Sequence, residues 1–470
     1  MDASKKIPNP PKELKQPYIT SETFGHINTR WNFPHLNADG LISYEKFKRY
    51  FKKCVRVDKR KYLSSKLTFD SKASPAEKWK TIKSLRTKYQ PRPPCVFDHN
   101  GTLQPADRKQ EILSEFLQNT VWCCDISSSP DLHVHISSQL QVEISCPPSL
   151  LSPFEEHELF FALSKFKNGK STGSDQVKME YIKWSSLTFK HAVLSLLNDC
   201  FLTGTVPREW NYALIAMLPK GGTKDLRNPD MYRPISLSQT MYRLYASVLK
   251  YRLQSLVEPF LRPTQYGFKP KRSTSQPIFI LRRIIEKFER SGDSLHLLFL
   301  DWKKAFDSVN HIAVLKALQF FQVPEPLINA IMSLYTSISF NVKGSFAHRQ
   351  QYSQHRGVRQ GCPLSPLLFI MILSHIMHDI DFSLLQLNGS LPWIFSAECP
   401  LWDLEYADDT VVMARSGSLV ERILHLLMKR ADLVGLKLHS HKCEHLRLNS
   451  DYVVRDVHGE IIPQVKSVKI

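Results

Sequence analysis

The segment Leu401 to Ala414 reads LWDLEYADDTVVMA and holds the only Asp-Asp pair in the chain, Asp408-Asp409. An apolar run that ends in Tyr406 precedes the pair, and a second apolar run begins at Thr410. Two short apolar runs separated by a few polar residues are typical of a β-hairpin. We therefore predict two antiparallel strands whose tight turn carries both carboxylates at its tip.

A third acid stands in a similar setting. The apolar run Leu295 to Leu300 predicts a buried strand, and Asp301 follows it directly. Aspartate after a strand is most often a cap or turn residue. A carboxylate at the end of a buried strand is costly, however, unless a cation meets it. Three such acids could instead gather two Mg²⁺ ions, which would support an in-line phosphoryl displacement. From the residues alone, both interpretations stay open.

Several short sequence motifs surround these acids. In order along the chain they are Leu218 to Lys220 (LPK), Tyr232 to Leu237 (YRPISL), Gln265 to Phe268 (QYGF), Leu300 to Asp307 (LDWKKAFD), Gly357 to Pro366 (GVRQGCPLSP), Tyr406 to Asp409 (YADD) and Gly435 to Lys442. In these motifs and in their order, the chain resembles the reverse transcriptases of non-LTR (LINE-like) retrotransposons.

The resemblance implies an α+β fold of the right-hand polymerase type. Its expected parts are a basic, mostly helical N-terminal extension over residues 1–150, fingers over 151–290 and a palm over 291–470. The sequence ends about where the family's primer-grip hairpin would begin, so we expect the thumb to be largely absent.

The resemblance also assigns roles to individual residues. Asp301, Asp408 and Asp409 would bind two Mg²⁺ ions, for which Mn²⁺ is a possible substitute. Phe306 would act as a steric gate against a 2′-hydroxyl, although it could be an ordinary core aromatic. The remaining expected site residues are Gln360 and Gly361 at the incoming nucleotide and template, Arg233 and Lys220 as phosphate clamps or simple surface charges, and Lys442 as proton donor to the leaving pyrophosphate.

Composition supports a polyanionic partner. The 470 residues include 63 Lys and Arg against 44 Asp and Glu, a net charge of +19. Residues 46–66 hold ten of these cations and one acid, Asp58. Lysine and arginine that neutralise phosphates release condensed counterions, which favours binding of nucleic acid. The expected partners are an RNA template, a DNA primer or target and dNTPs, while protein partners cannot be named. A solvated helix face is the alternative for residues 46–66.

Several classes of protein are disfavoured. The longest apolar stretch, residues 367–377, is interrupted by Ser374 and His375 and is shorter than a membrane span. Nine cysteines without a C-x-x-C spacing favour a reducing, intracellular location, in the nucleus or the cytoplasm. A zinc site at His439, His441, Cys443 and His445 is possible, but on a strand these alternate side chains would spread over about 20 Å.

Two functions remain as hypotheses. The first is an RNA-directed DNA polymerase that adds dNTPs to a DNA 3′-end by two-metal nucleotidyl transfer. The second is a truncated, catalytically weak or inactive remnant of such an element that still binds nucleic acid.

Overall fold

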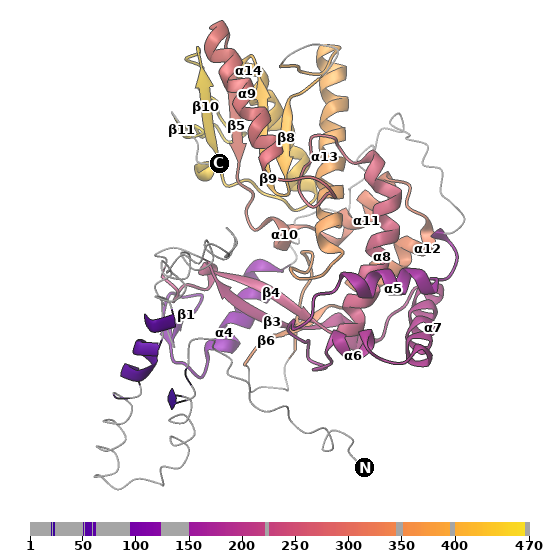
Figure 1. The fold of residues 1–470 in the computed structure, drawn as a ribbon. Coiled ribbons are helices and arrows are strands. Elements are labelled where there is room, and N and C mark those ends of the chain that lie inside the picture. The colour runs from indigo at the N-terminus through magenta and orange to yellow at the C-terminus, as the bar shows by residue number, and fades with distance from the viewer. Residues whose placement is uncertain are drawn as a thin grey trace, which may run out of the picture. The chain divides into compact units, whose positions relative to one another are not determined.

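The computed structural model describes residues 95–123, 150–220, 225–344, 351–394 and 400–465, together with short stretches between residues 20 and 62. The chain separates into two compact units, Met1–Arg92 and Pro93–Ile470. In the first unit, residues 52–58 are helical, and the Asp58 carboxylate accepts hydrogen bonds from the backbone N–H and the hydroxyl of Thr20. The second unit holds the predicted motifs and combines helices with β-sheets, which confirms the α+β class (Figure 1).

A five-stranded sheet carries the acidic residues. Its order is β11 (Gln464–Val465), β10 (Glu444–Leu448), β5 (Leu295–Leu300), β9 (Asp409–Ala414) and β8 (Asp403–Tyr406). The central strand β5 is apolar because helices cover both faces of the sheet. Leu298 and Leu300 face the core that includes α13 (Ser365–Asn388) and α14 (Gly417–Leu433), whereas Leu295 and Leu297 face α9 (Ser275–Ser291).

A second sheet has the order β4 (Tyr232–Ser238), β3 (Tyr212–Pro219), β6 (Ser339–Val342) and β7 (Tyr352–Ser353). The helix α4 (Lys109–Phe116) and the following turn Leu117–Val121 pack Leu113, Leu117 and Trp122 against it. The small hairpin of β1 (Val96–Phe97) and β2 (Leu103–Gln104) precedes them. Residues 95–123 therefore belong to the same compact unit as this sheet, although the sequence suggested a boundary near residue 150. The division into fingers and palm stays a prediction.

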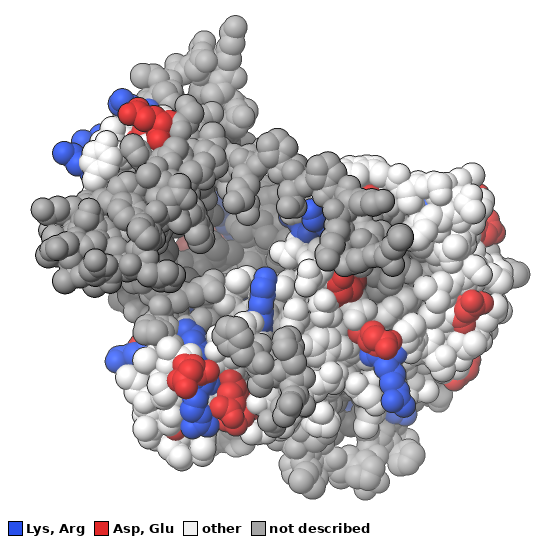
Figure 2. All heavy atoms as spheres, turned by 90° about the horizontal axis from the view of Figure 1, so that it is seen from below, with Lys and Arg blue, Asp and Glu red and all other residues white. Residues whose placement is uncertain are grey.

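Charged side chains on the face drawn in Figure 2 are mixed. Among the described residues of this face, lysine and arginine lie beside aspartate and glutamate and form no single continuous basic patch. The positive net charge alone therefore does not locate a binding surface on this face.

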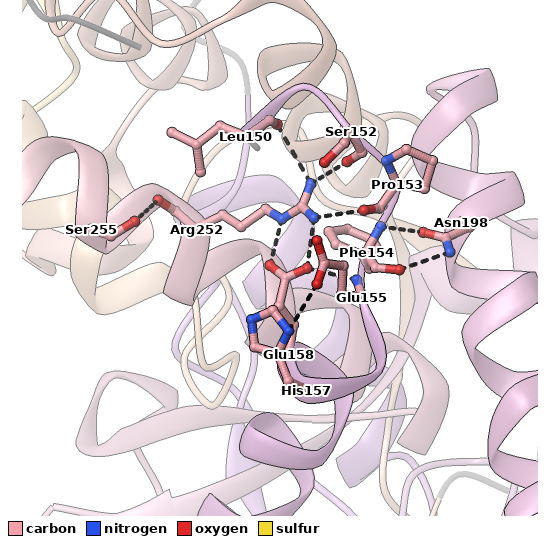
Figure 3. A network of polar contacts seen from close by, with 10 residues as sticks. All are labelled: Leu150, Ser152, Pro153, Phe154, Glu155, His157, Glu158, Asn198, Arg252 and Ser255. Atoms are coloured by element: carbon pink, nitrogen blue, oxygen red, sulfur yellow. Dashed lines mark hydrogen bonds and ion pairs between the residues drawn. The ribbon is translucent and has the colours of Figure 1, made fainter. Parts of the chain in front are cut away.

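The helical layer consists of α5 (Glu156–Lys165), α6 (Met179–Lys183), α7 (Leu187–Thr203), α8 (Thr240–Val257), α11 (His311–Phe320) and α12 (Glu325–Met332). Arg252 of α8 forms hydrogen bonds with the residues just before α5 and with the first turn of that helix (Figure 3). Its guanidinium donates to the carbonyls of Ser152 and Pro153 and to both oxygens of Glu158, each of the latter at 2.6 Å. Because Arg252 is buried, these bonds replace the water that the cation loses.

The apolar spacing of the sequence predicts helices over residues 154–167, 187–202, 274–290, 311–321 and 418–434, and α5, α7, α9, α11 and α14 begin and end within two residues of these bounds. The same spacing predicts a helix over residues 236–257, but the strand β4 extends to Ser238 and α8 begins at Thr240; Pro234 inside the strand concealed it. A helix is also predicted over residues 364–380, and α13 continues beyond it to Asn388. Residues 365–387 are apolar and long enough to cross a membrane by composition, but 67% of this stretch is buried inside the protein, as in a core helix.

Candidate active site

The strand register brings the three predicted acids together. Leu300 of β5 pairs with Thr410 of β9, so Asp301 and Asp409 follow at neighbouring positions on adjacent strands. Tyr406 pairs with Asp409 across the 403–414 hairpin, which leaves Ala407 and Asp408 as its two turn residues. Asp408 is half-buried, while Asp301 and Asp409 are exposed. The structure thus places the three carboxylates at one edge of the sheet, as the sequence predicted.

Charge and burial at this edge are consistent with a cation site. Partial loss of water and the negative charges of Asp408 and Asp301 raise the pKa of Asp409. The Lys442 ammonium lies 3.7 Å from the Asp301 carboxylate, although more than half of its side chain is exposed to water. Such an exposed pair contributes little stability, about 0–1 kcal/mol. It nevertheless places Lys442 at the acidic edge.

The donor set suits a hard cation. All three side chains offer carboxylate oxygens, which Mg²⁺ prefers, and Mg²⁺ usually binds through one or two carboxylates plus substrate phosphates. Within the described part of the chain, no three His, Cys, Asp or Glu side chains are arranged to hold a metal by themselves. The three carboxylates therefore have the chemistry that Mg²⁺ prefers, while their joint binding of metal ions stays a prediction.

One cleft of about 1060 Å³ connects this edge to the sheet of β3 and β4. Nearly all of the site residues that the sequence predicts line this cleft. Asp301, Asp408, Lys442, Lys220, Arg233, Phe306, Gln360 and Gly361 all line it. Asp409 is the predicted site residue outside this lining. Segments that are up to 222 positions apart in the sequence therefore meet around one space, which we call the central cleft.

Phe306, in the short helix α10 (Ala305–Ser308), presents its ring to this cleft. The ring stacks on Phe369 at 4.5 Å between centroids and meets Phe268 edge-on at 6.1 Å. Phe306 is only half-buried, so one side stays accessible. Gly361 lies at φ +117°, and a Cβ there would approach the Ser236 carbonyl oxygen to 2.7 Å. A side chain at residue 361 would therefore displace the cleft wall.

One cleft residue that the sequence did not single out is Asp307. The Asp307 carboxylate accepts hydrogen bonds from Trp122 Nε1 at 3.2 Å and from Gln360 Nε2 at 2.6 Å. Burial raises the pKa of Asp307 to about 6, even though these donors and Lys304 favour its ionised form. Asp307 belongs to a quoted motif, but its partners lie 185 and 53 positions away. No local signal could have found them.

The predicted phosphate clamps differ in their surroundings. Arg233 is exposed on β4. Lys220 follows β3, and its ammonium donates to the Asp230 carbonyl at 2.7 Å. Lys304, which was not predicted, forms an ion pair with the Asp230 carboxylate at 2.6 Å and adopts a left-handed φ of +46°. All three cations line the central cleft together with Asp301 and Asp408.

The alternative zinc site is not formed. Cys443 is fully buried, and burial raises the pKa of its thiol to about 11, which disfavours the thiolate that zinc requires. His445 instead stacks on His296, with ring nitrogens 3.1 Å apart. His439 and His441 lie outside this pair, on the turn before β10.

Comparison with known families identifies the class of protein. Residues 218–469 match the family model described as reverse transcriptase (RNA-dependent DNA polymerase). The match covers more than half of the chain, so the chain belongs to this family. The residues of the match include the acid-bearing strands and most of the central cleft.

Its relatives narrow the class to proteins of non-LTR retrotransposons. The chain is 28% identical over 333 residues to the uncharacterized 149 kDa protein of transposon TX1 from Xenopus laevis, covering 70% of this chain and 24% of that protein. It is 28% identical over 291 residues to the Pol polyprotein of the type-1 retrotransposable element R2 from Popillia japonica, covering 62% and 39%. The probable RNA-directed DNA polymerase of transposon X-element from Drosophila melanogaster is 27% identical over 316 residues, covering 65% and 33%.

These comparisons confirm the resemblance that the motifs indicated. The chain spans about a quarter to two fifths of the length of these relatives. A structural similarity to apo telomerase from Candida tropicalis, truncated from its C-terminal domain, has a TM-score of 0.39 at 13% identity and covers 60% of this chain and 59% of that one.

Proposed function

We propose that the chain is an RNA-directed DNA polymerase of a non-LTR retrotransposon, which extends a DNA 3′-end with dNTPs on an RNA template. One observation carries the proposal. The ends of β5 and the 403–414 hairpin present Asp301 and Asp408 to the same cleft that Lys220, Arg233, Phe306 and Gln360 line, and Asp409 follows Asp408 at the start of β9. A cleft that is lined by both acids and cations suits a substrate that carries both phosphates and metal ions.

Divalent metal ions are general in this family. Asp301, Asp408 and Asp409 would hold them, with Mg²⁺ as the expected ion and Mn²⁺ as a substitute. When bound, a metal pair activates the attacking 3′-oxygen and stabilises the departing oxygen. The chain's own residues would bind the phosphates and supply a proton. Arg233 and Lys220 would bind phosphate oxygens, and Lys442, beside Asp301, would donate a proton to the leaving pyrophosphate.

Substrate choice would depend on Phe306. Its ring is held between Phe268 and Phe369, so it cannot turn away easily from a nucleotide in the cleft. A bulky ring at this position would exclude a ribose 2′-hydroxyl. We therefore expect dNTPs as substrates, with an RNA template and a DNA primer as partners. Copying into a chromosome would require an intracellular location that includes the nucleus.

Primer extension on an RNA template tests the proposal. The full chain should extend a DNA primer with dNTPs in a Mg²⁺-dependent manner. Asp408→Asn, which removes one charge from a direct metal ligand, should lower the rate by at least about 10²-fold. If the chain shows no Mg²⁺-dependent extension but binds RNA in a salt-sensitive way, the nucleic-acid-binding remnant is the better account.

A second assay tests the role of Phe306. Phe306→Ala should raise the efficiency of rNTP incorporation relative to that of dNTPs, and Phe306→Tyr serves as the matched variant that keeps the bulk. If the unmodified chain already uses rNTPs as well as dNTPs, Phe306 is not a gate.

A further inference from the structure

Gln265 lies beneath the tip of the 403–414 hairpin and is fully buried. It belongs to the loop between α8 and α9, which runs alongside β8: the Tyr266 N–H donates to the Glu405 carbonyl at 2.8 Å, and the Glu405 N–H donates to the Thr264 carbonyl at 3.0 Å. Gln265 does not line the central cleft. Its side chain therefore has a role other than contact with a nucleotide.

The Gln265 amide bonds both backbone polar groups of Ala407, its N–H and its carbonyl. Its Oε1 accepts from the backbone N–H of Ala407 at 2.9 Å and of Gly267 at 2.7 Å. Its Nε2 donates to the Ala407 carbonyl at 3.3 Å and to the Glu405 carboxyl at 3.2 Å. Because two N–H donors converge on one amide oxygen, the orientation of the amide is fixed. A fully satisfied buried amide of this kind holds its neighbours rigidly.

The residue that Gln265 holds is strained. Ala407, the first turn residue of the hairpin, has a φ of +59°. This left-handed conformation is unfavourable for an alanine, so surrounding contacts must maintain it. Asp408 is the next residue. A change in the φ of Ala407 would therefore rotate the Asp408 carboxylate relative to Asp301.

Gly267 lets the loop that carries Gln265 lie directly against the backbone of Ala407. A Cβ at Gly267 would lie 2.1 Å from the Ala407 nitrogen and 2.7 Å from its Cα. No side chain fits there without displacement of the hairpin. The next residue, Phe268, meets the ring of Phe306 edge-on. The same short loop therefore touches both the hairpin that carries the acids and the expected gate.

We propose that Gln265, supported by Gly267, is a positioning residue that holds the Ala407–Asp408 turn in its strained conformation and so sets the geometry of the metal-binding carboxylates. The catalytic part of this inference rests on the proposed polymerase function. The structural part does not, because it concerns the conformation of the turn itself.

The test compares Gln265→Ala with a matched control. Asn211→Ala also removes a buried amide that donates two backbone hydrogen bonds, at 3.0 and 2.8 Å, but Asn211 lies outside the central cleft and the hairpin. Hydrogen exchange should accelerate at the Ala407 amide in Gln265→Ala and stay unchanged there in Asn211→Ala. Mn²⁺ titration followed by electron paramagnetic resonance should show weaker binding in Gln265→Ala only.

Steady-state kinetics separate positioning from simple loss of stability. Gln265→Ala should lower kcat by about 10²-fold and raise the Mg²⁺ concentration needed for half-maximal rate, since displacement by about 1 Å has effects of this size. The KM for dNTP should change little. Gly267→Ala should reproduce this pattern by displacing the same turn.

The outcomes are distinct. Unchanged exchange at Ala407 in Gln265→Ala would overturn the proposal, as would the same shift in Mn²⁺ affinity and Mg²⁺ requirement in Asn211→Ala. If the unmodified chain has no polymerase activity, the proposed function fails, while hydrogen exchange and Mn²⁺ binding still decide whether Gln265 holds the turn.

Discussion

At the scale of single residues, the buried Asp307 carboxylate determines how the Gln360 side chain is oriented in the cleft. An ionised carboxylate only accepts hydrogen bonds, so Gln360 must turn its NH₂ group toward Asp307. The amide oxygen of Gln360 then remains as an acceptor for a ligand. A protonated Asp307 could donate instead, and the orientation of the Gln360 amide would no longer be fixed.

This arrangement predicts a pH dependence. Burial raises the pKa of Asp307 to about 6, so the carboxylate that orients Gln360 forms as the pH rises from 5 to 7. Polymerase activity should rise over this interval, and Asp307→Asn should flatten the rise while lowering the activity at pH 7. The activity of both proteins across pH 5–8 checks this. An identical pH profile for the two would contradict the role of Asp307.

The same pKa has a consequence for stability. The folded chain binds this proton more tightly than the unfolded chain, whose aspartate titrates near 3.8. Stability from this group is thus present below pH 3.8 and is lost as the pH rises through about 6, by about 3 kcal/mol in total. Asp307→Asn should lack this contribution to the pH dependence of the free energy of unfolding.

At the scale of elements, local patterns predicted the hairpin, the buried strand β5 and most helices, because their apolar spacing directly reflects one or two covered faces. They did not predict β4, where Pro234 interrupts the pattern. Nor could they predict that Gln265 bonds Ala407, 142 positions away, or that Trp122 bonds Asp307. Such contacts depend on how whole elements pack together, so a short stretch of sequence does not predict them.

Arg252 of α8 gives a prediction at this scale. Arg252→Met would leave the partly buried Glu158 carboxylate without its partner, so the free energy of unfolding should fall by about 3–5 kcal/mol. Arg283→Met, which breaks the exposed pair with Glu286 on α9, should cost less than about 1 kcal/mol. Urea unfolding of both variants checks this. Similar losses for both would show that burial does not determine the contribution of Arg252.

At the scale of the whole molecule, the first unit and the second carry separate evidence for nucleic acid. In the first, Lys52, Lys53, Arg56 and Arg60 are exposed, while Asp58 is buried against Thr20. The Asp58 carboxylate is thus hydrogen-bonded to Thr20, and the four cations are exposed to water. In the second, cations and acids line the same central cleft.

Replacing these four cations of the first unit with glutamine should weaken RNA binding and reduce the slope of log K against log salt. With about 0.7 ions released per contact on a single strand, the slope should fall by up to about 3. Mn²⁺ binding should not change, since the acids that we expect to bind metal lie in the other unit. Fluorescence anisotropy with an RNA oligonucleotide over a salt series measures the slope. An unchanged slope would assign residues 52–60 to a solvated helix face.

The central claim is that Asp301 and the Asp408-Asp409 pair act as one metal site. Titration of Mn²⁺ by electron paramagnetic resonance, with an RNA template, a 3′-deoxy-terminated DNA primer and a matching dNTP, measures it most directly. We predict two tightly bound ions in the unmodified chain and fewer in both Asp301→Asn and Asp408→Asn. Two ions of unchanged affinity in both variants would contradict the account.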